Sequence, residues 1–237
     1  YYRSHGFREV YFRDEIFTVN RKRTQEICRR LIEDRVDVTW ICNAKVGLID
    51  QPTMELMKAA GCHLIKFGVE SGVQEILDRV EKGFKVEETA ETFRWAREVE
   101  IDTHAHVMLG MPGDTRETIQ RTIEFVKEIG PSTATFGICT PYPGTPLFDW
   151  VAERTGRLGD GADIDLSVLH TTAPFNELYT DLSPNELEQS IRRAYRKFYL
   201  RPGYIASRAA KISTLGELKR VVIAGAKIFD FTVRGDQ

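Results

Sequence analysis

HVMLGMPGDT, residues 106–115, is the stretch that decides the fold of this chain. Its apolar run from Val107 to Met111 has the length of a buried strand. The Pro-Gly pair that follows forces a tight turn, and Asp114 with Glu117 three residues later is a helix-start capping pattern. A strand that turns through glycine into a helix is typical of parallel α/β folds, which bind ligands at the carboxyl ends of their strands.

The same strand, turn and helix unit recurs along the chain. Five segments have strand character, namely Glu9 to Phe12, Val38 to Cys42, His63 to Glu70, His104 to Gly110 and Thr133 to Thr140. Each precedes a helical stretch, namely Arg21 to Arg35, Pro52 to Ala60, Val86 to Glu98, Thr115 to Ile129 and Pro146 to Thr155. This alternation predicts an α/β fold with a parallel sheet, either open or part of a barrel.

Length and composition set the broad class. The chain has 237 residues and 42% hydrophobic content, enough to bury the core of one domain with an appendage. Its formal charge of −2 gives no global reason to expect nucleic acid or an acidic lipid surface as a partner. No apolar run approaches the roughly 18 residues of a membrane span and no signal-peptide pattern opens the chain, so we expect a cytoplasmic protein.

The four cysteines, Cys28, Cys42, Cys62 and Cys139, are scattered along the chain. No pair has the spacing of a Cys-x2-Cys metal clip. We interpret them as reduced thiols in the core, where a small apolar side chain is common. Their spacing encodes neither a cluster nor a zinc site.

The two ends of the sequence add further expectations. The chain opens without methionine, and Tyr1 to Gly6 have the pattern of a last helical turn, so we expect a preceding strand and helix unit in the complete protein. Near the other end, Pro184 to Leu200 and Leu215 to Phe229 are predicted helices, the first with a capping box at Ser183. The Gly-rich segment Thr155 to Asp181 is either a lid over a cavity or a simple connector.

Five motifs occur in a fixed order that is more specific than any one of them. They are FRDEIF at residues 12–17, MKAAGC at 57–62, GVESG at 68–72, LGMPGDT at 109–115 and TPYPGT at 140–145. This order resembles the radical S-adenosylmethionine (SAM) enzymes, most closely the branch of anaerobic magnesium-protoporphyrin monomethyl ester cyclase and the cobalamin-dependent methyltransferases. The similarity covers roughly residues 1–155.

The resemblance implies a partial barrel of six parallel strands, in which a 4Fe-4S cluster reduces SAM to a 5′-deoxyadenosyl radical. It assigns residues 1–155 to the partial barrel. The composition and the helix signals of the rest predict a loop or lid at 156–182 and a C-terminal helical extension at 183–237. The family's Cys-x3-Cys-x2-Cys run is absent here, so the five predicted strands correspond to strands two to six and this chain alone should be inactive. A small-molecule substrate, a flavodoxin or ferredoxin as electron donor, and cobalamin in the full-length protein are also implied.

The resemblance further implies roles for residues at the strand ends. Glu70 and Ser71 would contact the ribose hydroxyls or the methionine end of SAM; the alternative is that Glu70 caps the next helix. Leu109 and Gly110 would wall the adenine together with Val107 and Met111. The turn at Pro112 and Gly113 would lie beside it, with a plain turn in a core strand as the alternative.

Further residues follow the other predicted strands. Thr140 and Tyr142 would meet the adenine edge, although an aromatic side chain at a barrel rim is as often a packing residue. Asp14, Asn43 and Lys45 would face the substrate, with surface solvation as the alternative for Asp14. The catalytic residues cannot be assigned.

Two other classes of function are open on sequence alone. His104 and His106 share a strand face, as in metal-dependent hydrolase barrels, but they lie near the start of the strand and lack an obvious third ligand. The apolar stripe of the helix from Pro184 to Leu200 is typical of a docking helix, so a non-catalytic binding or scaffold module is a further alternative. Packing of that stripe on the barrel is the simpler interpretation.

Overall fold

The computed structural model describes residues 5–156 and 175–234. The chain divides into two compact units, one formed by Tyr1–Val107 and Glu124–Thr135 and the other by Met108–Ile123 and Phe136–Gln237. Most of the segment predicted as a lid, and most of the predicted helical turn at the amino terminus, lie outside the described residues.

One five-stranded sheet has the order β1-β2-β3-β4-β5. Its strands run parallel, which confirms the predicted α/β class. Their bounds are β1 Glu9–Phe12, β2 Thr39–Ala44, β3 Cys62–Glu70, β4 Asp102–Leu109 and β5 Thr133–Ile138. The prediction extended the last strand by two residues to Thr140, where the structure has already left the sheet.

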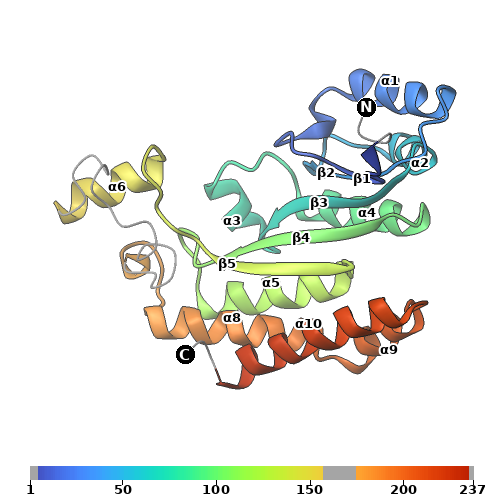
Figure 1. Ribbon diagram of the computed structural model, residues 1–237. Coiled ribbons are helices and arrows are strands. Elements are labelled where there is room, and N and C mark those ends of the chain that lie inside the picture. The colour runs from blue at the N-terminus through green and yellow to red at the C-terminus, as the bar shows by residue number, and fades with distance from the viewer. Residues whose placement is uncertain (1–4, 157–174, 235–237) are drawn as a thin grey trace. The chain divides into compact units, whose positions relative to one another are not determined.

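Helices follow the strands, as Figure 1 labels them. Their bounds in the first unit are α1 Arg21–Glu33, α2 Gln51–Ala59, α3 Gln74–Arg79 and α4 Val86–Glu98, with a 3-10 helix η2 at Phe17–Val19. The others are α5 Arg116–Ile129, α6 Pro146–Thr155, η3 Asn176–Leu178, α8 Pro184–Tyr199, α9 Pro202–Ala210 and α10 Leu215–Arg234. The short α3 and α9 were not predicted, because α3 has six residues without a side-chain cap and α9 has no buried residue.

The two faces of the sheet in the first unit differ in polarity. Side chains on one face are almost fully buried, among them Cys42, Ile65 and Phe67. Helix α4 packs there, since the Phe67 and Phe93 rings lie 5.3 Å apart. The other face carries mainly polar, partly exposed residues, namely Asn43, Lys66, Glu70, His104 and His106. Parallel sheets are usually apolar on both faces, so a polar face indicates a surface for ligands.

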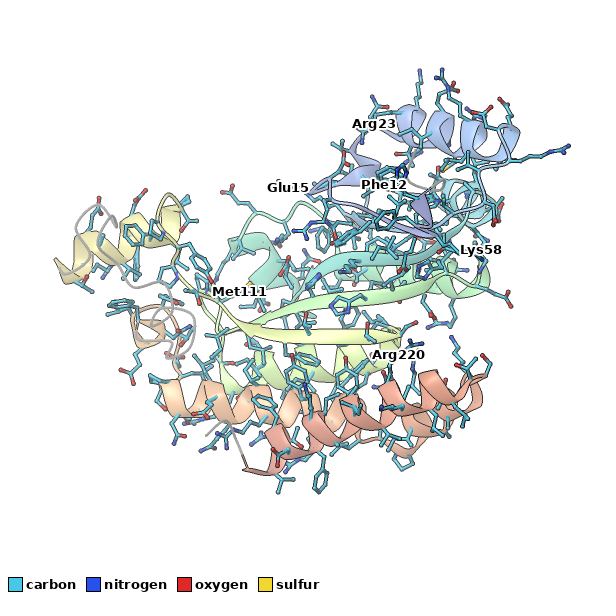
Figure 2. The ribbon with its side chains drawn as sticks, viewed as in Figure 1. Phe12, Glu15, Arg23, Lys58, Met111 and Arg220 are labelled. Carbon is cyan, nitrogen blue, oxygen red and sulfur yellow. The ribbon has the colours of Figure 1, made fainter. Side chains whose placement is uncertain are left out.

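An aromatic cluster closes the edge of this unit at β1. The Phe12 ring stacks on Phe17 at 4.9 Å, and Trp40 lies 5.3 Å from Phe12 and 5.4 Å from Phe17. Trp40 is fully buried and its indole N–H donates to the Ala60 carbonyl at 2.7 Å. The guanidinium of Arg23 on α1 lies 5.8 Å from the centre of the Phe17 ring. Figure 2 labels Arg23 and Phe12. Aromatic pairs of this geometry stabilise a core beyond their buried area.

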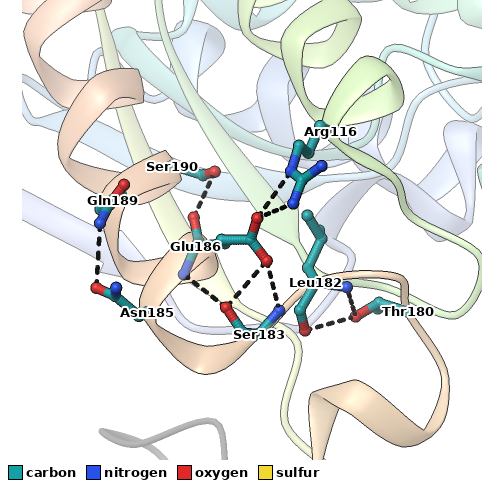
Figure 3. Close-up of polar contacts among 8 residues, drawn as sticks. All are labelled: Arg116, Thr180, Leu182, Ser183, Asn185, Glu186, Gln189 and Ser190. Atoms are coloured by element: carbon teal, nitrogen blue, oxygen red, sulfur yellow. Dashed lines mark hydrogen bonds and ion pairs between the residues drawn. The ribbon is translucent and has the colours of Figure 1, made fainter.

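The second unit contains the predicted capping box at the start of α8. Ser183 accepts from the Glu186 backbone N–H, and the Glu186 carboxylate accepts from the Ser183 N–H at 2.9 Å (Figure 3). The same carboxylate accepts from Arg116 Nε at 2.7 Å. The Ser183 N–H and the Arg116 guanidinium therefore lower the pKa of Glu186 to about 2. These contacts fix the start of α8 against the start of α5.

The apolar stripe of α8 packs within its own unit. Its buried side chains are Leu187, Ile191, Ala194 and Phe198. Phe198 lies 6.1 Å from the Phe136 ring and Tyr195 lies 5.4 Å from the Phe231 ring of α10. The docking-helix alternative therefore loses its support. None of the helices within the described residues is both long and apolar enough to cross a membrane.

Gly61, between α2 and β3, shows why this connection needs glycine. Its φ is +94°, and a Cβ there would lie 2.4 Å from the Val38 carbonyl oxygen. The Gly61 carbonyl in turn accepts from the Trp40 N–H at 3.0 Å. A close backbone contact and a left-handed conformation therefore coincide at this residue.

We expect Gly61→Ala to destabilise the first unit by roughly 2–4 kcal/mol, because it adds backbone strain to a clash that only backbone movement can relieve. Urea unfolding followed by tryptophan fluorescence measures the loss. Gly203→Ala in α9 is the control, since its Cβ would meet nothing within 4 Å. Equal stabilities of the two variants would contradict this account of the connection.

Candidate functional site

The carboxyl end of β3 carries the most unusual backbone of the sheet. Glu70 has φ 61°, which is rare for a residue other than glycine. It follows a β-bulge, because the register with β4 shifts between Gly68 and Glu70. Its carboxylate accepts from Lys82 Nζ at 2.8 Å, with 14% of the side chain exposed. Such strain costs on the order of 1–3 kcal/mol and is common at functional sites.

Ser71 and Gly72 fix the turn that follows Glu70. The Ser71 hydroxyl is buried and accepts from the Val73 N–H at 3.1 Å. A Cβ on Gly72 would lie 2.5 Å from Phe125 Cβ, so the chain passes too close to α5 for a side chain. Helix α3 begins without a side-chain cap, so the alternative role of Glu70 as a helix cap is wrong. Ser71 orders the backbone here, and its role toward SAM stays a prediction.

The turn after β4 lies in the second unit and is organised by Asp114. Its carboxylate accepts from the Met111 N–H at 2.9 Å and from the Thr118 hydroxyl at 2.7 Å. Burial raises the pKa of Asp114, while these hydrogen bonds lower it. The predicted capping pair of Asp114 and Glu117 is wrong: Thr115 and Thr118 cap α5 reciprocally, at 3.2 and 2.8 Å. Asp114 closes the turn before them.

The apolar side chains predicted to contact the adenine are buried within the protein. The side chains of Val107, Leu109 and Met111 are at most 3% exposed. Gly110 has φ 74°, and a Cβ there would lie 2.8 Å from Leu187 Cδ2. Side-chain contacts to adenine from these three apolar residues would thus require movement.

Polar contacts in the second unit hold the same turn. The Gly110 carbonyl accepts from Asn176 Nδ2 at 3.1 Å, and the Leu109 carbonyl accepts from the Cys139 N–H at 2.8 Å. The Gly113 N–H donates to the Tyr179 carbonyl at 2.7 Å. Pro112 and Gly113 remain partly exposed.

Thr140 and Tyr142 follow β5 in the same unit. The Thr140 hydroxyl donates to the Ile138 carbonyl at 3.2 Å. The Tyr142 carbonyl accepts from the Thr145 hydroxyl at 2.6 Å, and Thr145 in turn caps α6. With 39% of its surface exposed, the Tyr142 ring is accessible to a ligand.

The predicted substrate residues of the first unit lie around β1 and β2. Asp14 lies beyond the end of β1 and pairs with Arg23 on α1 at 3.0 Å. Asn43 lies within β2 instead of after it. It accepts from the Tyr11 hydroxyl at 2.7 Å and donates to the Asp14 carbonyl at 3.0 Å. Lys45 follows β2 and is partly exposed.

The structure adds Lys66 to the candidate residues. Lys66 pairs in register with Asn43 on β2 and with His104 on β4, so the three side chains form a row on the polar face. Sequence reasoning missed Lys66, although its alternation with Gly68 and Glu70 along β3 gave a signal. Only the strand register shows that it neighbours the two histidines.

His104 and His106 are bound by threonines of β5. The two rings lie 4.5 Å apart. His104 contacts Thr133 through Nδ1 at 2.7 Å and Thr135 through Nε2 at 3.2 Å, and His106 contacts Thr135 through Nδ1 at 3.0 Å. Burial, then the neighbouring His106 and Lys66, lower the pKa of His104 to about 4. Both imidazoles are therefore neutral near pH 7.

A hydrolase site would need a third ligand beside this pair. Within the described residues no three His, Cys, Asp or Glu side chains converge as a metal site. His170, one of the other histidines, lies outside that part of the chain. The structure gives the hydrolase alternative no added support.

Comparison with known proteins decides the family. The sequence profile of the Radical SAM superfamily matches residues 3–126, more than half of the 237 residues. The chain belongs to the radical SAM superfamily. Membership implies the use of SAM and a 4Fe-4S cluster. It also confirms the resemblance drawn from the motif order.

Curated relatives within the superfamily are longer than this chain. An uncharacterized methyltransferase of Pyrococcus horikoshii is 30% identical over 198 residues, covering 84% of this chain and 42% of the relative. The anaerobic magnesium-protoporphyrin IX monomethyl ester cyclase of Cereibacter sphaeroides is 30% identical over 202 residues, covering 83% and 32%. The chain thus spans less than half the length of these radical SAM relatives.

Solved structures share the radical SAM fold. One is the methyltransferase TsrM of Kitasatospora setae, solved with cobalamin and a 4Fe-4S cluster, with a TM-score of 0.59 at 21% identity. The match covers 64% of this chain and 29% of the TsrM chain. The cobalamin-dependent enzyme OxsB has a TM-score of 0.64 at 12% identity, and the match covers 98% of this chain and 41% of the OxsB chain. At these identities the likeness concerns the fold alone.

The four thiols of the chain can be compared with what a radical SAM cluster needs. Cluster ligands are thiolates. Cys28, Cys42 and Cys62 are at most 1% exposed, and burial raises the pKa of Cys28 to about 12 and that of Cys62 as well. Cys139, just after β5, is partly exposed. As placed in the structure, these cysteines do not fit a cluster.

The histidine pair makes the stability of this chain sensitive to acid. Because the folded pKa of His104 is about 4 against 6.5, the unfolded chain binds more protons between these values and stability falls as pH drops. The wild type should lose free energy of unfolding between pH 7 and pH 5. We expect His104→Gln to reduce that loss by roughly 1 kcal/mol, after allowance for solvent screening. Urea titrations at both pH values measure it.

His5→Gln is the control, because His5 is an exposed residue before β1. It should keep the acid sensitivity of the wild type. An unchanged pH dependence in His104→Gln would show that folding does not lower the pKa of this imidazole.

Proposed function

We propose that this chain supplies the SAM-binding part of a radical SAM enzyme that cyclises or methylates a small organic molecule. The observation that carries the proposal is Glu70, strained and partly exposed at the carboxyl end of β3. In parallel α/β folds ligands bind at that end of the strands. The names of the matched cyclase and methyltransferases support the two reaction types.

Glu70 has the chemistry to hold a nucleoside. A carboxylate accepts only, so its two oxygens suit the paired hydroxyl donors of a ribose. Lys82 Nζ donates to one oxygen, Oε1, and leaves acceptor positions on the other. The left-handed backbone directs this side chain over Gly68, where a Cβ would lie 2.6 Å from Glu70 Oε1. In this superfamily, bound SAM is the source of a 5′-deoxyadenosyl radical.

Other predicted residues are assigned to SAM by position. Tyr142 offers an exposed ring after β5. Pro112 and Gly113 are partly exposed after β4. Ser71, Leu109, Gly110 and Thr140 would act by holding these turns in shape, since their side chains or backbone groups are engaged within the protein.

The ligands of the cluster are proposed to come from outside these 237 residues. Three of the four thiols are core residues, and no Cys-x3-Cys-x2-Cys run is present. On this proposal the chain alone is inactive. A flavodoxin or ferredoxin would deliver electrons to the whole protein. The cobalamin in the solved structures of TsrM and OxsB supports a cobalamin-dependent reaction.

We expect Glu70→Gln to weaken SAM binding by about 10-fold or more, because it removes a charged acceptor from the ribose hydroxyls. Equilibrium dialysis with radiolabelled SAM measures the dissociation constant. Glu81→Gln is a matched control, since Glu81 is another glutamate with a positive φ, 52°, and lies outside the site. If both variants bind SAM as the wild type does, the ribose role of Glu70 is wrong.

Anaerobic reconstitution with iron and sulfide tests the origin of the cluster. The 237-residue chain should retain no stable cluster after desalting, because three of its four thiols are buried in the core and burial raises the pKa of Cys28 and Cys62. Iron and acid-labile sulfide analysis with the absorbance near 400 nm provides the measurement. A stoichiometric four-iron cluster that survives desalting would overturn the proposal that its ligands lie elsewhere.

A further inference from the structure

The polar face of the first unit carries two cations around one aromatic ring. Lys66 Nζ lies 4.5 Å from the centre of the Tyr11 ring, and the Arg13 guanidinium lies 5.2 Å from the same centre. Neither cation pairs with a carboxylate of the described residues. The Tyr11 hydroxyl donates to Asn43, so the ring is held in place under Lys66. The cluster thus has positive charge without a counter-ion from the described chain.

Carboxylates near this cluster are engaged elsewhere. Glu70 pairs with Lys82 at 2.8 Å, Asp14 with Arg23 at 3.0 Å, and Glu9 lies 2.6 Å from His63. The row formed by Asn43, Lys66 and His104 across three strands contains no acid. A ligand with a negative charge could therefore pair with Lys66 and Arg13, which no carboxylate of the described residues pairs with.

The hydrogen bonds of the histidine pair leave one ring nitrogen available. Thr135 Oγ1 lies within hydrogen-bond distance of His104 Nε2 and His106 Nδ1. A hydroxyl has one hydrogen, so Thr135 donates to one imidazole and accepts from the other. When Thr135 donates to His106 Nδ1, the proton of His106 resides on Nε2 and can be donated to a ligand. Within the described residues His106 Nε2 makes no other hydrogen bond, and His106 is exposed.

The electrostatics of the row of Asn43, Lys66 and His104 suit a single negative charge. Burial and the charge of Lys66 lower the pKa of both histidines, and burial outweighs the Glu70 carboxylate, which raises the pKa of His106, so the imidazoles add a donor without adding charge. Lys66 then provides the positive charge at the centre of the row. A carboxylate has two acceptor oxygens and one charge, which match one ammonium and one imidazole N–H.

We infer that Lys66 and His106 bind a carboxylate group of the substrate on the polar face of the sheet. Lys66 supplies the charge, and His106 Nε2–H fixes the orientation of the second oxygen. His104 and the two threonines are positioning residues, because they set the tautomer of His106. The inference rests on the proposed function in placing the substrate on this face, and it narrows the substrate to organic acids.

Propionate is the probe, titrated into the ¹⁵N-histidine-labelled 237-residue chain at pH 7 and constant ionic strength. Two-bond ¹H–¹⁵N spectra should show a saturable shift of the His106 ring nitrogens, which the His106→Gln variant identifies. Lys66→Met should weaken propionate binding by about 10-fold or more, and Lys66→Arg should retain most of it. Lys22→Met, which changes an exposed lysine of α1, is the matched control and should bind as the wild type does.

Three results would overturn the inference. One is the absence of a saturable propionate shift, a second is unchanged binding in Lys66→Met, and a third is inorganic phosphate binding tighter than propionate at the same residues. SAM binding measured in the same proteins separates the two proposals. Lys66→Met should leave SAM affinity unchanged, and Glu70→Gln should not weaken propionate binding, because it removes a negative charge that acts on His106. A chain that binds propionate but not SAM would refute the proposed function alone.

Discussion

The alternation of side chains along β3 is the constraint on which the functional account depends. Phe67 and Val69 point into the packed core, so Lys66 and Gly68 are placed on the opposite, accessible face. A slip of one residue would bury Lys66 and expose Phe67, which makes the register costly to change. A β-bulge precedes Glu70, and the Glu70 backbone is left-handed at the end of the strand. The proposed carboxylate site, with Lys66, and the proposed nucleoside site, with Glu70, thus both depend on the register of β3.

The sequence predicted most of the architecture because its boundaries have local causes. Helix α6 begins where predicted, since Thr145 caps it and Pro146 occupies its first turn. The capping box of α8 was equally visible. The start of α5 was misassigned because Asp114 and Thr115 are both good caps, and only the structure shows that Asp114 bonds back to Met111. Short elements such as α3 lack enough periodic residues to be recognised.

The candidate site was predictable in position but not in its contacts. The motif containing Glu70 indicated a polar strand end, and the structure places it there. Its partner Lys82 is twelve residues later, beyond a helix that sequence reasoning did not find. The row of Asn43, Lys66 and His104 depends on pairing between strands distant in sequence, which no local pattern encodes. The adenine contacts of Val107, Leu109 and Met111 stay a prediction, because these apolar side chains are buried in the core of the chain.

The central claim is that the strained Glu70 at the end of β3 receives the ribose of SAM. A crystal structure of this chain with S-adenosylhomocysteine tests it most directly. We expect the ribose hydroxyls within hydrogen-bond distance of the Glu70 carboxylate, with Glu70 still in the left-handed conformation and Lys82 still paired to it. A nucleoside bound away from the carboxyl end of β3, or a Glu70 that relaxes to an ordinary extended conformation without contacting it, would contradict the account.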